Sequence, residues 1–284
     1  MGTLVNRRRV MGGGTKVVKQ YLKFIALEDG TFQYPQALEY SLDNGSTWVS
    51  LAAATPTPTI QADSSILWRG TYTPSSSNNC FSATGEFNAS GNPKSVWAGD
   101  NFEKATLVNN AFNRMFNGCT NIIDASELVM PTDYVSQACC YEMFRGCTNL
   151  ITPPDLPATT IAINCYSGMF RGCTNLASAP SELPATTLYR SCYEQMFRDC
   201  KQLTTSPVLP ALTLAQTCYY YMFANSSKVN YVKAMFTTIG TNSIYMWLSN
   251  VSATGTFVKN TNATWTTTGA SGVPTGWTIE YETP

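Results

Sequence analysis

The chain has 284 residues, with 18 basic and 18 acidic side chains, a formal net charge of zero and no histidine. Zero net charge argues against nucleic acid as the main partner, and the lack of histidine excludes triads and metal sites built on imidazole. No stretch is apolar over the length of a bilayer and no C-x-x-C pair occurs, so we expect no membrane insertion, no metal and no cofactor.

Residues 1–18 are interpreted as a basic N-terminal arm. Three arginines, Arg7, Arg8 and Arg9, precede Gly12–Gly14, whose spacing is not that of a phosphate-binding loop. The arm is expected to dock on an acidic groove of a partner, with a solvated tail as the alternative. The first residues lack the apolar segment of a secretory signal, so we expect synthesis in the cytoplasm.

Residues 19–97 predict a β-sandwich-like module. Tyr21–Leu27 and Ile66–Arg69 resemble strands, and Asp43–Ser46 is a strong hairpin turn between two more. The alternation in Cys80–Asn88 indicates a second hairpin. Short strands separated by turn residues are typical of a sandwich.

Residues 98–248 contain five copies of a Met-Phe phrase. Their phenylalanines step by 28, 26, 27 and 26 residues along the chain, at Phe116, Phe144, Phe170, Phe197 and Phe223. A fixed period of this size predicts stacked repeats that share one core. In the copy Cys192–Cys200, the spacing of Cys, Met and Cys at i, i+4 and i+8 predicts a short helix followed by an extended stretch and a proline-bounded return.

The cysteines of these repeats recur at fixed places. Two series step with the repeat: one consists of Cys139, Cys165, Cys192 and Cys218, the other of Cys119, Cys147, Cys173 and Cys200. Small apolar core residues are the preferred interpretation, because free cysteine is usually buried. Disulfides between neighbouring repeats are the alternative.

The repeats resemble the BspA-type leucine-rich repeat. Phe144–Leu150 and Phe170–Leu176 follow its Phe-x-Gly-Cys-x-x-Leu phrase. The opening residues and the close Val273–Thr278 are similar to surface and virion proteins of gut Bacteroides and their phages. We therefore predict a β-rich α+β chain: the sandwich-like module, a short BspA-type solenoid, and a C-terminal β cap over residues 249–284.

A row of tyrosines and a row of arginines are the candidate ligand-binding residues of the repeats. They are Tyr141, Tyr166, Tyr193, Tyr219, Arg145, Arg171 and Arg198. Flat rings beside guanidinium groups suit a sugar or a protein surface on the host. The alternative is that the tyrosine rings pack between repeats. No catalytic constellation stands out, so we do not expect an enzyme.

The resemblance implies a structural, adhesive virion protein, a phage head or tail fibre. The arm would dock on other virion proteins, and the repeats would form a knob that binds the host surface. The protein would be made in the host cytoplasm, and a symmetric homotrimer is expected, with a monomeric knob as the alternative. Two other functions stay open: a bacterial cell-surface or glycan-binding adhesin, and a carbohydrate-cleaving spike.

Overall fold

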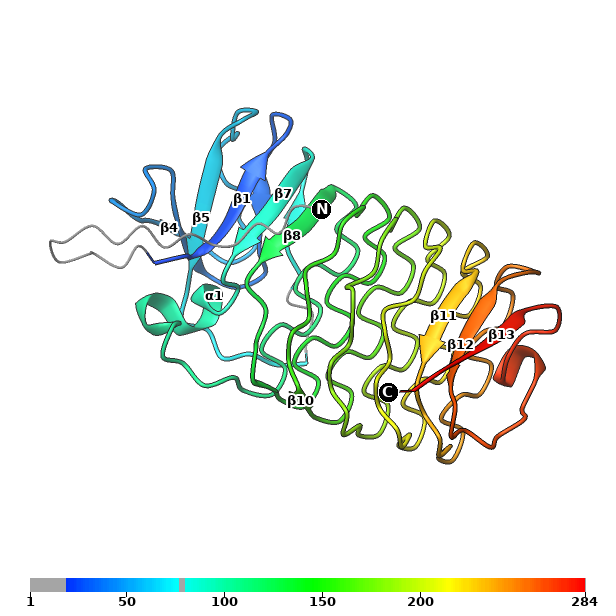
Figure 1. Cartoon of the computed structure of the whole chain (residues 1–284). Coiled ribbons are helices and arrows are strands. Elements are labelled where there is room, and N and C mark those ends of the chain that lie inside the picture. Colours follow the sequence, from blue (N-terminus) through cyan, green and yellow to red (C-terminus); the bar gives the residue numbers. More distant parts are fainter. Residues whose placement is uncertain (1–18, 77–79, 284) are drawn as a thin grey trace, which may run out of the picture.

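The computed structural model describes residues 19–76 and 80–283, so the predicted docking arginines Arg7, Arg8 and Arg9 lie outside the described residues. The described chain is elongated (Figure 1): a twisted sheet at one end continues into stacked turns, which finish in three strands at the other end. One four-residue helix, α1 (Ser95–Ala98), and two 3-10 turns, η1 (Gly99–Asn101) and η2 (Gly269–Ser271), are its helical elements.

The N-terminal part is built on one six-stranded sheet. Its strands run in the order β4-β3-β5-β1-β7-β8, and all pair antiparallel except β7 with β8. Their bounds are β1 (Leu22–Ala26), β3 (Leu38–Ser41), β4 (Val49–Leu51), β5 (Ser65–Arg69), β7 (Phe87–Gly91) and β8 (Ile122–Leu128). The parallel pair joins the N-terminal part to the first repeat, so the sheet runs across the boundary drawn at residue 97.

The hairpin around Asp43–Ser46 is confirmed, because β3 and β4 pair through Tyr40 and Val49. The hairpin predicted in Cys80–Asn88 is wrong: β6 (Ser82–Ala83) pairs with β2 (Phe32–Gln33), whereas β7 pairs with β1. The segment between β6 and β7 is bonded to the chain before β2 and does not form a hairpin turn, since the Thr84 hydroxyl accepts a hydrogen bond from Thr31 N at 2.8 Å. A six-stranded sheet and a separate two-stranded pair do not confirm the predicted sandwich.

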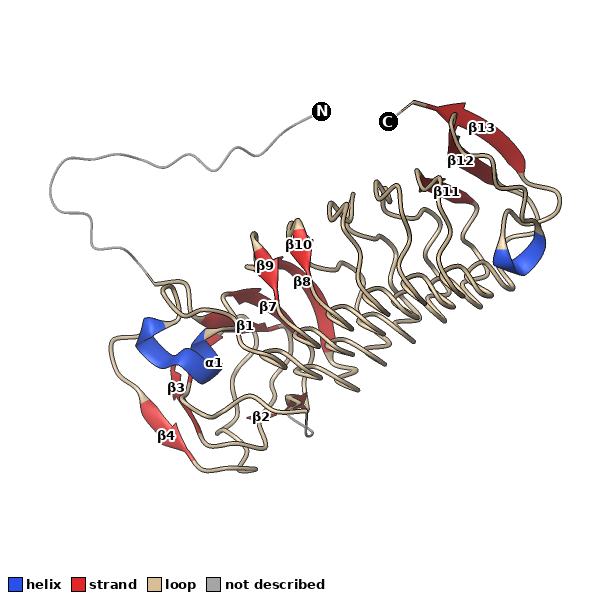
Figure 2. Cartoon of the chain, turned by 90° about the horizontal axis from the view of Figure 1, so that it is seen from below, coloured by secondary structure: helices blue, strands red, loops and turns tan. Residues whose placement is uncertain are grey.

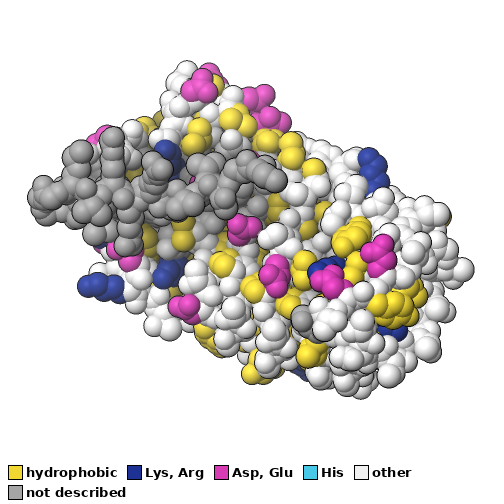
Figure 3. Space-filling model, viewed as in Figure 1, with side chains coloured by type: hydrophobic (Ala, Val, Ile, Leu, Met, Phe, Trp, Pro, Cys, Tyr) yellow, Lys and Arg dark blue, Asp and Glu magenta, His cyan; other side chains and the backbone are white. Residues whose placement is uncertain are grey.

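From β8 onward the chain forms a β-rich solenoid of about six turns, seen from below in Figure 2. One side is a parallel sheet that ends in β11 (Tyr231–Ala234), β12 (Thr256–Asn260) and β13 (Thr278–Glu282). A second side begins with the parallel pair β9 (Tyr134–Val135) and β10 (Thr160–Ile161). On the exposed face in Figure 3, charged side chains are scattered among uncharged ones.

The third side of the solenoid is a ribbon of turns, and here the predicted helices are wrong. In the third turn, Ser167 N, Met169 N and Arg171 N each donate to the carbonyl three residues earlier. The residues between them donate across to the next turn of the solenoid: Gly168 N to Glu194 O at 2.7 Å and Phe170 N to Met196 O at 2.9 Å. No α-helix occurs between residues 102 and 283, and we call this segment of each turn the turn ribbon.

The turn ribbon repeats its backbone conformation every four residues. One residue in four has a positive φ, as at Asn164, Gly168 and Gly172 with φ of 56°, 62° and 76°. Glycine and asparagine enter this left-handed region most easily. Side chains at i, i+4 and i+8 therefore share a side, and Cys192, Met196 and Cys200 are all 0% exposed. The i, i+4, i+8 spacing therefore predicts the buried side correctly, but the backbone that carries it is the turn ribbon and not a helix.

The core of the solenoid is a stack of aromatic rings lined by thiols. Neighbouring phenylalanine rings lie 5.2 to 5.6 Å apart and nearly parallel, from Phe116 through Phe223. Three thiols beside the stack, those of Cys147, Cys173 and Cys200, donate to the phenylalanine carbonyl of the preceding turn, as Cys173 Sγ does to Phe144 O at 3.0 Å. Ser226 makes the same bond to Phe197 O at 2.7 Å. The cysteines are therefore core residues.

Candidate functional site

Three of the predicted ligand-binding tyrosines lie in the core. Tyr166, Tyr193 and Tyr219 are each 1% exposed. Their rings stack at 5.8 and 6.1 Å, and Tyr219 stacks on Trp247 at 6.1 Å. A ligand on the surface does not reach them, which corrects the expected surface stripe. The cause is the four-residue period, because each of these tyrosines precedes a core phenylalanine by four positions.

Tyr141 belongs to a different row from the other predicted tyrosines. Its equivalents in successive turns are Ser167, Glu194, Tyr220 and Tyr245, as the cross-turn hydrogen bonds show. Tyr141 is half-buried on the outer side of the turn ribbon, and the Arg114 guanidinium lies 5.5 Å from its ring centre. Burial, and then the negative charge of Glu142, raises the pKa of Tyr141.

The outer side of the turn ribbons, which we call the ribbon face, carries a cluster of three tyrosines near its C-terminal end. Tyr220 stacks on Tyr245 at 5.3 Å, and Tyr221 meets these rings edge-on at 4.6 and 5.6 Å. Tyr245 is 45% exposed. The Arg198 guanidinium lies 5.3 Å from the ring centre of Tyr221. We call Tyr220, Tyr221 and Tyr245 the tyrosine cluster.

Arg145, Arg171 and Arg198 occupy equivalent positions in successive turns, but they differ in their partners. Arg145 Nη1 pairs with Glu142 Oε1 at 2.8 Å, while Arg114 Nε pairs with Glu142 Oε2 at 2.9 Å. Arg198 pairs with Asp199 at 3.4 Å. Within residues 19–76 and 80–283, the side chain of Arg171 makes neither an ion pair nor a hydrogen bond. Burial, then the like charges of Arg145 and Arg198, lowers the pKa of Arg171.

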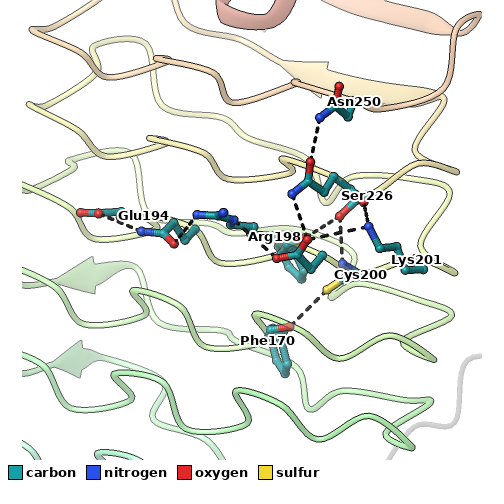
Figure 4. A network of polar contacts seen from close by, with 11 residues as sticks. Phe170, Glu194, Arg198, Cys200, Lys201, Ser226 and Asn250 are labelled. Carbon is teal, nitrogen blue, oxygen red and sulfur yellow. Dashed lines mark hydrogen bonds and ion pairs between the residues drawn. The ribbon is translucent and has the colours of Figure 1, made fainter.

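A chain of polar contacts fixes the side chains around Arg198 (Figure 4). Arg198 Nη1 donates to Gln195 Oε1 at 3.1 Å, and Gln195 Nε2 donates to Glu194 Oε1 at 3.3 Å. On the other side, Asp199 accepts from Asn225 Nδ2 at 3.0 Å, and Asn225 Oδ1 accepts from Asn250 Nδ2 at 2.8 Å. These contacts link three successive turns and hold the face in one arrangement.

A polar hollow of about 220 Å³ opens on the ribbon face above Gly168. We call it the Gly168 hollow. Its walls come from three successive turns: Tyr141, Glu142, Asn164, Ser167, Arg171, Glu194 and Gln195. Gln195 connects the hollow to the tyrosine cluster, because it bonds Arg198, which lies over Tyr221. The hollow and the tyrosine cluster therefore belong to one continuous surface.

Sequence reasoning did not identify Gly168 or Tyr245 as members of a site. A column-by-column alignment of the turns is the signal that finds both. Tyr245 stands in the Tyr141 column, and Gly168 is the residue without a side chain in the column of Arg114, Glu142, Gln195 and Tyr221. The last turn lacks the repeated Met-Phe phrase, because Trp247 stands in place of its methionine.

Within the described part of the chain, no group of three or more acidic or cysteine side chains is arranged to hold a metal ion. None of the described helices is long and apolar enough to cross a bilayer. Comparison with protein-family models, with curated proteins and with solved structures finds no match to this chain.

Proposed function

We propose that this is a non-enzymatic adhesive protein that binds a host-surface glycan on its ribbon face. The observation that carries the proposal is the tyrosine cluster, in which Tyr245 is exposed on the same face as a hollow lined by polar and charged groups. Aromatic rings offer flat apolar area with little loss of conformational entropy. Amide, carboxylate and guanidinium groups then fix the hydroxyls of the same ligand.

Rigidity of the ribbon face supports the same proposal. The polar contacts of Figure 4 tie Glu194, Arg198 and Asn225 to one another across turns. Beneath them, the phenylalanine stack is 0% exposed. A binding face whose side chains are already in place loses less entropy when the ligand arrives.

The test is binding of the purified chain to an array of bacterial surface glycans, with Tyr245→Ala as the variant. Tyr134 on β9 is the matched control, because it is 47% exposed against 45% for Tyr245 and lies on another side of the solenoid. Loss of the exposed ring should weaken binding at least about tenfold, or ~1.4 kcal/mol, whereas Tyr134→Ala should leave it unchanged. Equal binding by the two variants would refute a role for the tyrosine cluster.

We further propose that the solenoid is a short BspA-type leucine-rich repeat displayed on a phage head or tail fibre. The repeated phrase supports this, since its Phe, Cys and Leu positions, as at Phe170, Cys173 and Leu176, are all 0% exposed. The basic arm would dock on another virion protein, and a bacterial surface adhesin is the alternative. Particles assembled with a chain lacking residues 1–18 test the docking. Normal incorporation would reject it.

A carbohydrate-cleaving spike is the second candidate function, because Glu142 and Glu194 line the same hollow. Glycosidases use two carboxylates on either side of the scissile bond. Against this, both oxygens of Glu142 accept from arginines at 2.8 and 2.9 Å, as in a structural ion pair. Reducing ends released from capsule by the wild type, and not by Glu194→Gln, would favour cleavage over adhesion.

A further inference from the structure

The Gly168 hollow exists because one turn lacks a side chain that its neighbours have. At the equivalent position stand Glu142 before it and Gln195 after it, with φ of 50° and 54°, against 62° at Gly168. The backbone conformation therefore admits a long side chain here. A Cβ at Gly168 would lie 3.1 Å from Cγ of Glu142 and would intrude on the wall. The glycine keeps this part of the face open.

The charge at the wall of the hollow is unbalanced at one residue. Arg171 faces the hollow without an ion-pair partner in the described ranges, between Arg145 and Arg198, which both have one. A guanidinium presents parallel donors that match a carboxylate in two hydrogen bonds. Arg145 and Arg198 repel Arg171, whereas Asp199 and Glu142 attract it. An anion in the hollow would supply the ion-pair partner that Arg171 lacks in the described ranges.

The remaining wall selects for hydroxyl groups and against a second negative charge. Ser167, Asn164 and Gln195 offer hydroxyl and amide groups, and Glu194 offers carboxylate oxygens that accept from sugar hydroxyls. Glu142 and Glu194 also repel a dianion, such as a phosphate monoester, more strongly than a ligand with one negative charge. The single charge of a carboxylate is balanced by one guanidinium, that of Arg171. The half-buried ring of Tyr141 gives one apolar wall.

We propose that the Gly168 hollow binds an acidic sugar unit, with its carboxylate on Arg171 and its hydroxyls on the polar wall. The inference rests on the proposed glycan binding and adds the class of sugar. The tyrosine cluster stands two to three turns further along the solenoid, about 10 to 15 Å away at the usual strand spacing. The same oligosaccharide therefore spans both, with an acidic unit in the hollow and a neutral unit on the tyrosine rings.

The test compares matched ligands by titration calorimetry. The acidic ligands are 3′-sialyllactose and tetragalacturonate; the neutral counterparts are lactose and the carboxyl-reduced tetrasaccharide, and a sulfated galactose tetrasaccharide is the third class. The wild type should bind at least one acidic ligand about tenfold more tightly than its neutral counterpart. Arg171→Gln should reduce this preference to less than about twofold, and Arg190→Gln, at an exposed arginine outside the hollow, should leave it intact.

Gly168→Gln is the second variant, because glutamine occupies the equivalent position one turn later at Gln195. It should fill the hollow and remove the acidic preference while the melting temperature stays close to that of the wild type. Tyr245→Ala should weaken acidic and neutral ligands alike. Neutral binding that depends on Tyr245 without any acidic preference would overturn this inference and leave the proposed function standing. Tightest binding of the sulfated ligand would also overturn it, and absence of binding to every ligand would overturn both proposals.

Discussion

Removal of one ring from the phenylalanine stack tests the core of the solenoid. Phe170 is 0% exposed and lies between Phe144 and Phe197, with ring centres 5.6 Å away on each side and planes within 10° and 14° of parallel. A buried Phe→Ala change costs about 3 to 5 kcal/mol, and an aromatic pair is worth about 0.5 to 1.5 kcal/mol beyond its area. Two stacked partners place Phe170→Ala near the upper end, at about 4 to 5 kcal/mol.

The assay is urea unfolding followed by tryptophan fluorescence, with thermal melting beside it. A loss of this size should lower the melting temperature by roughly 8 to 20 °C. Ile151→Ala is the control, because Ile151 is apolar and 46% exposed, and its change should stay within about 0.5 kcal/mol. A decrease in the free energy of unfolding below about 1 kcal/mol for Phe170→Ala would refute the stacked core, since removal of a fully buried ring costs more than that.

The remaining predictions concern the thiols, the turn ribbon and alkaline pH. Cys173→Ser should lower the free energy of unfolding in urea less than Cys173→Ala, because a serine hydroxyl already makes the equivalent hydrogen bond at Ser226. The reverse order would show that the thiol hydrogen bond does not contribute to stability. Gly172→Asn should cost less than about 1 kcal/mol and Gly172→Val more, since Asn225 holds the equivalent positive φ of 63° and valine resists it. Equal costs would contradict this reading of the turn. Burial raises the pKa of the Cys119 and Cys218 thiols to about 12. In the unfolded chain the thiols have their ordinary pKa of 9.0, so their contribution to stability should be full below about pH 9 and fall as the pH rises above it. A urea unfolding midpoint that does not change up to pH 11 would contradict this prediction.

The repeat and its shared core could be predicted from the sequence, because a period of 26 to 28 residues is independent of the local backbone. The helix could not be distinguished from the turn ribbon by the same means. Both place i, i+4 and i+8 on one side, and nine residues are too few to separate a period of 3.6 from one of four. Glycine, aspartate and asparagine at Gly146, Gly172, Asp199 and Asn225 are the signal for positive φ that favours the ribbon.

The candidate site was less accessible to sequence reasoning. Tyr193 and Phe197 are four residues apart, so the ribbon buries both, whereas tyrosine rings next to arginines suggested a surface. The sequence prediction groups Tyr141 with the buried tyrosines, although its equivalents in the fold include Tyr220 and Tyr245. The Gly168 hollow is defined by an absent side chain, and an absence becomes visible only when the neighbouring turns are aligned.

The most direct measurement of glycan binding on the ribbon face is a crystal structure of the protein soaked with 3′-sialyllactose, which joins one acidic unit to two neutral ones. The account predicts a sugar carboxylate within about 3 Å of the Arg171 guanidinium, in the hollow above Gly168, and a sugar ring against Tyr245. Sugar density on the parallel sheet of β11–β13, or an empty ribbon face at saturating ligand, would contradict it.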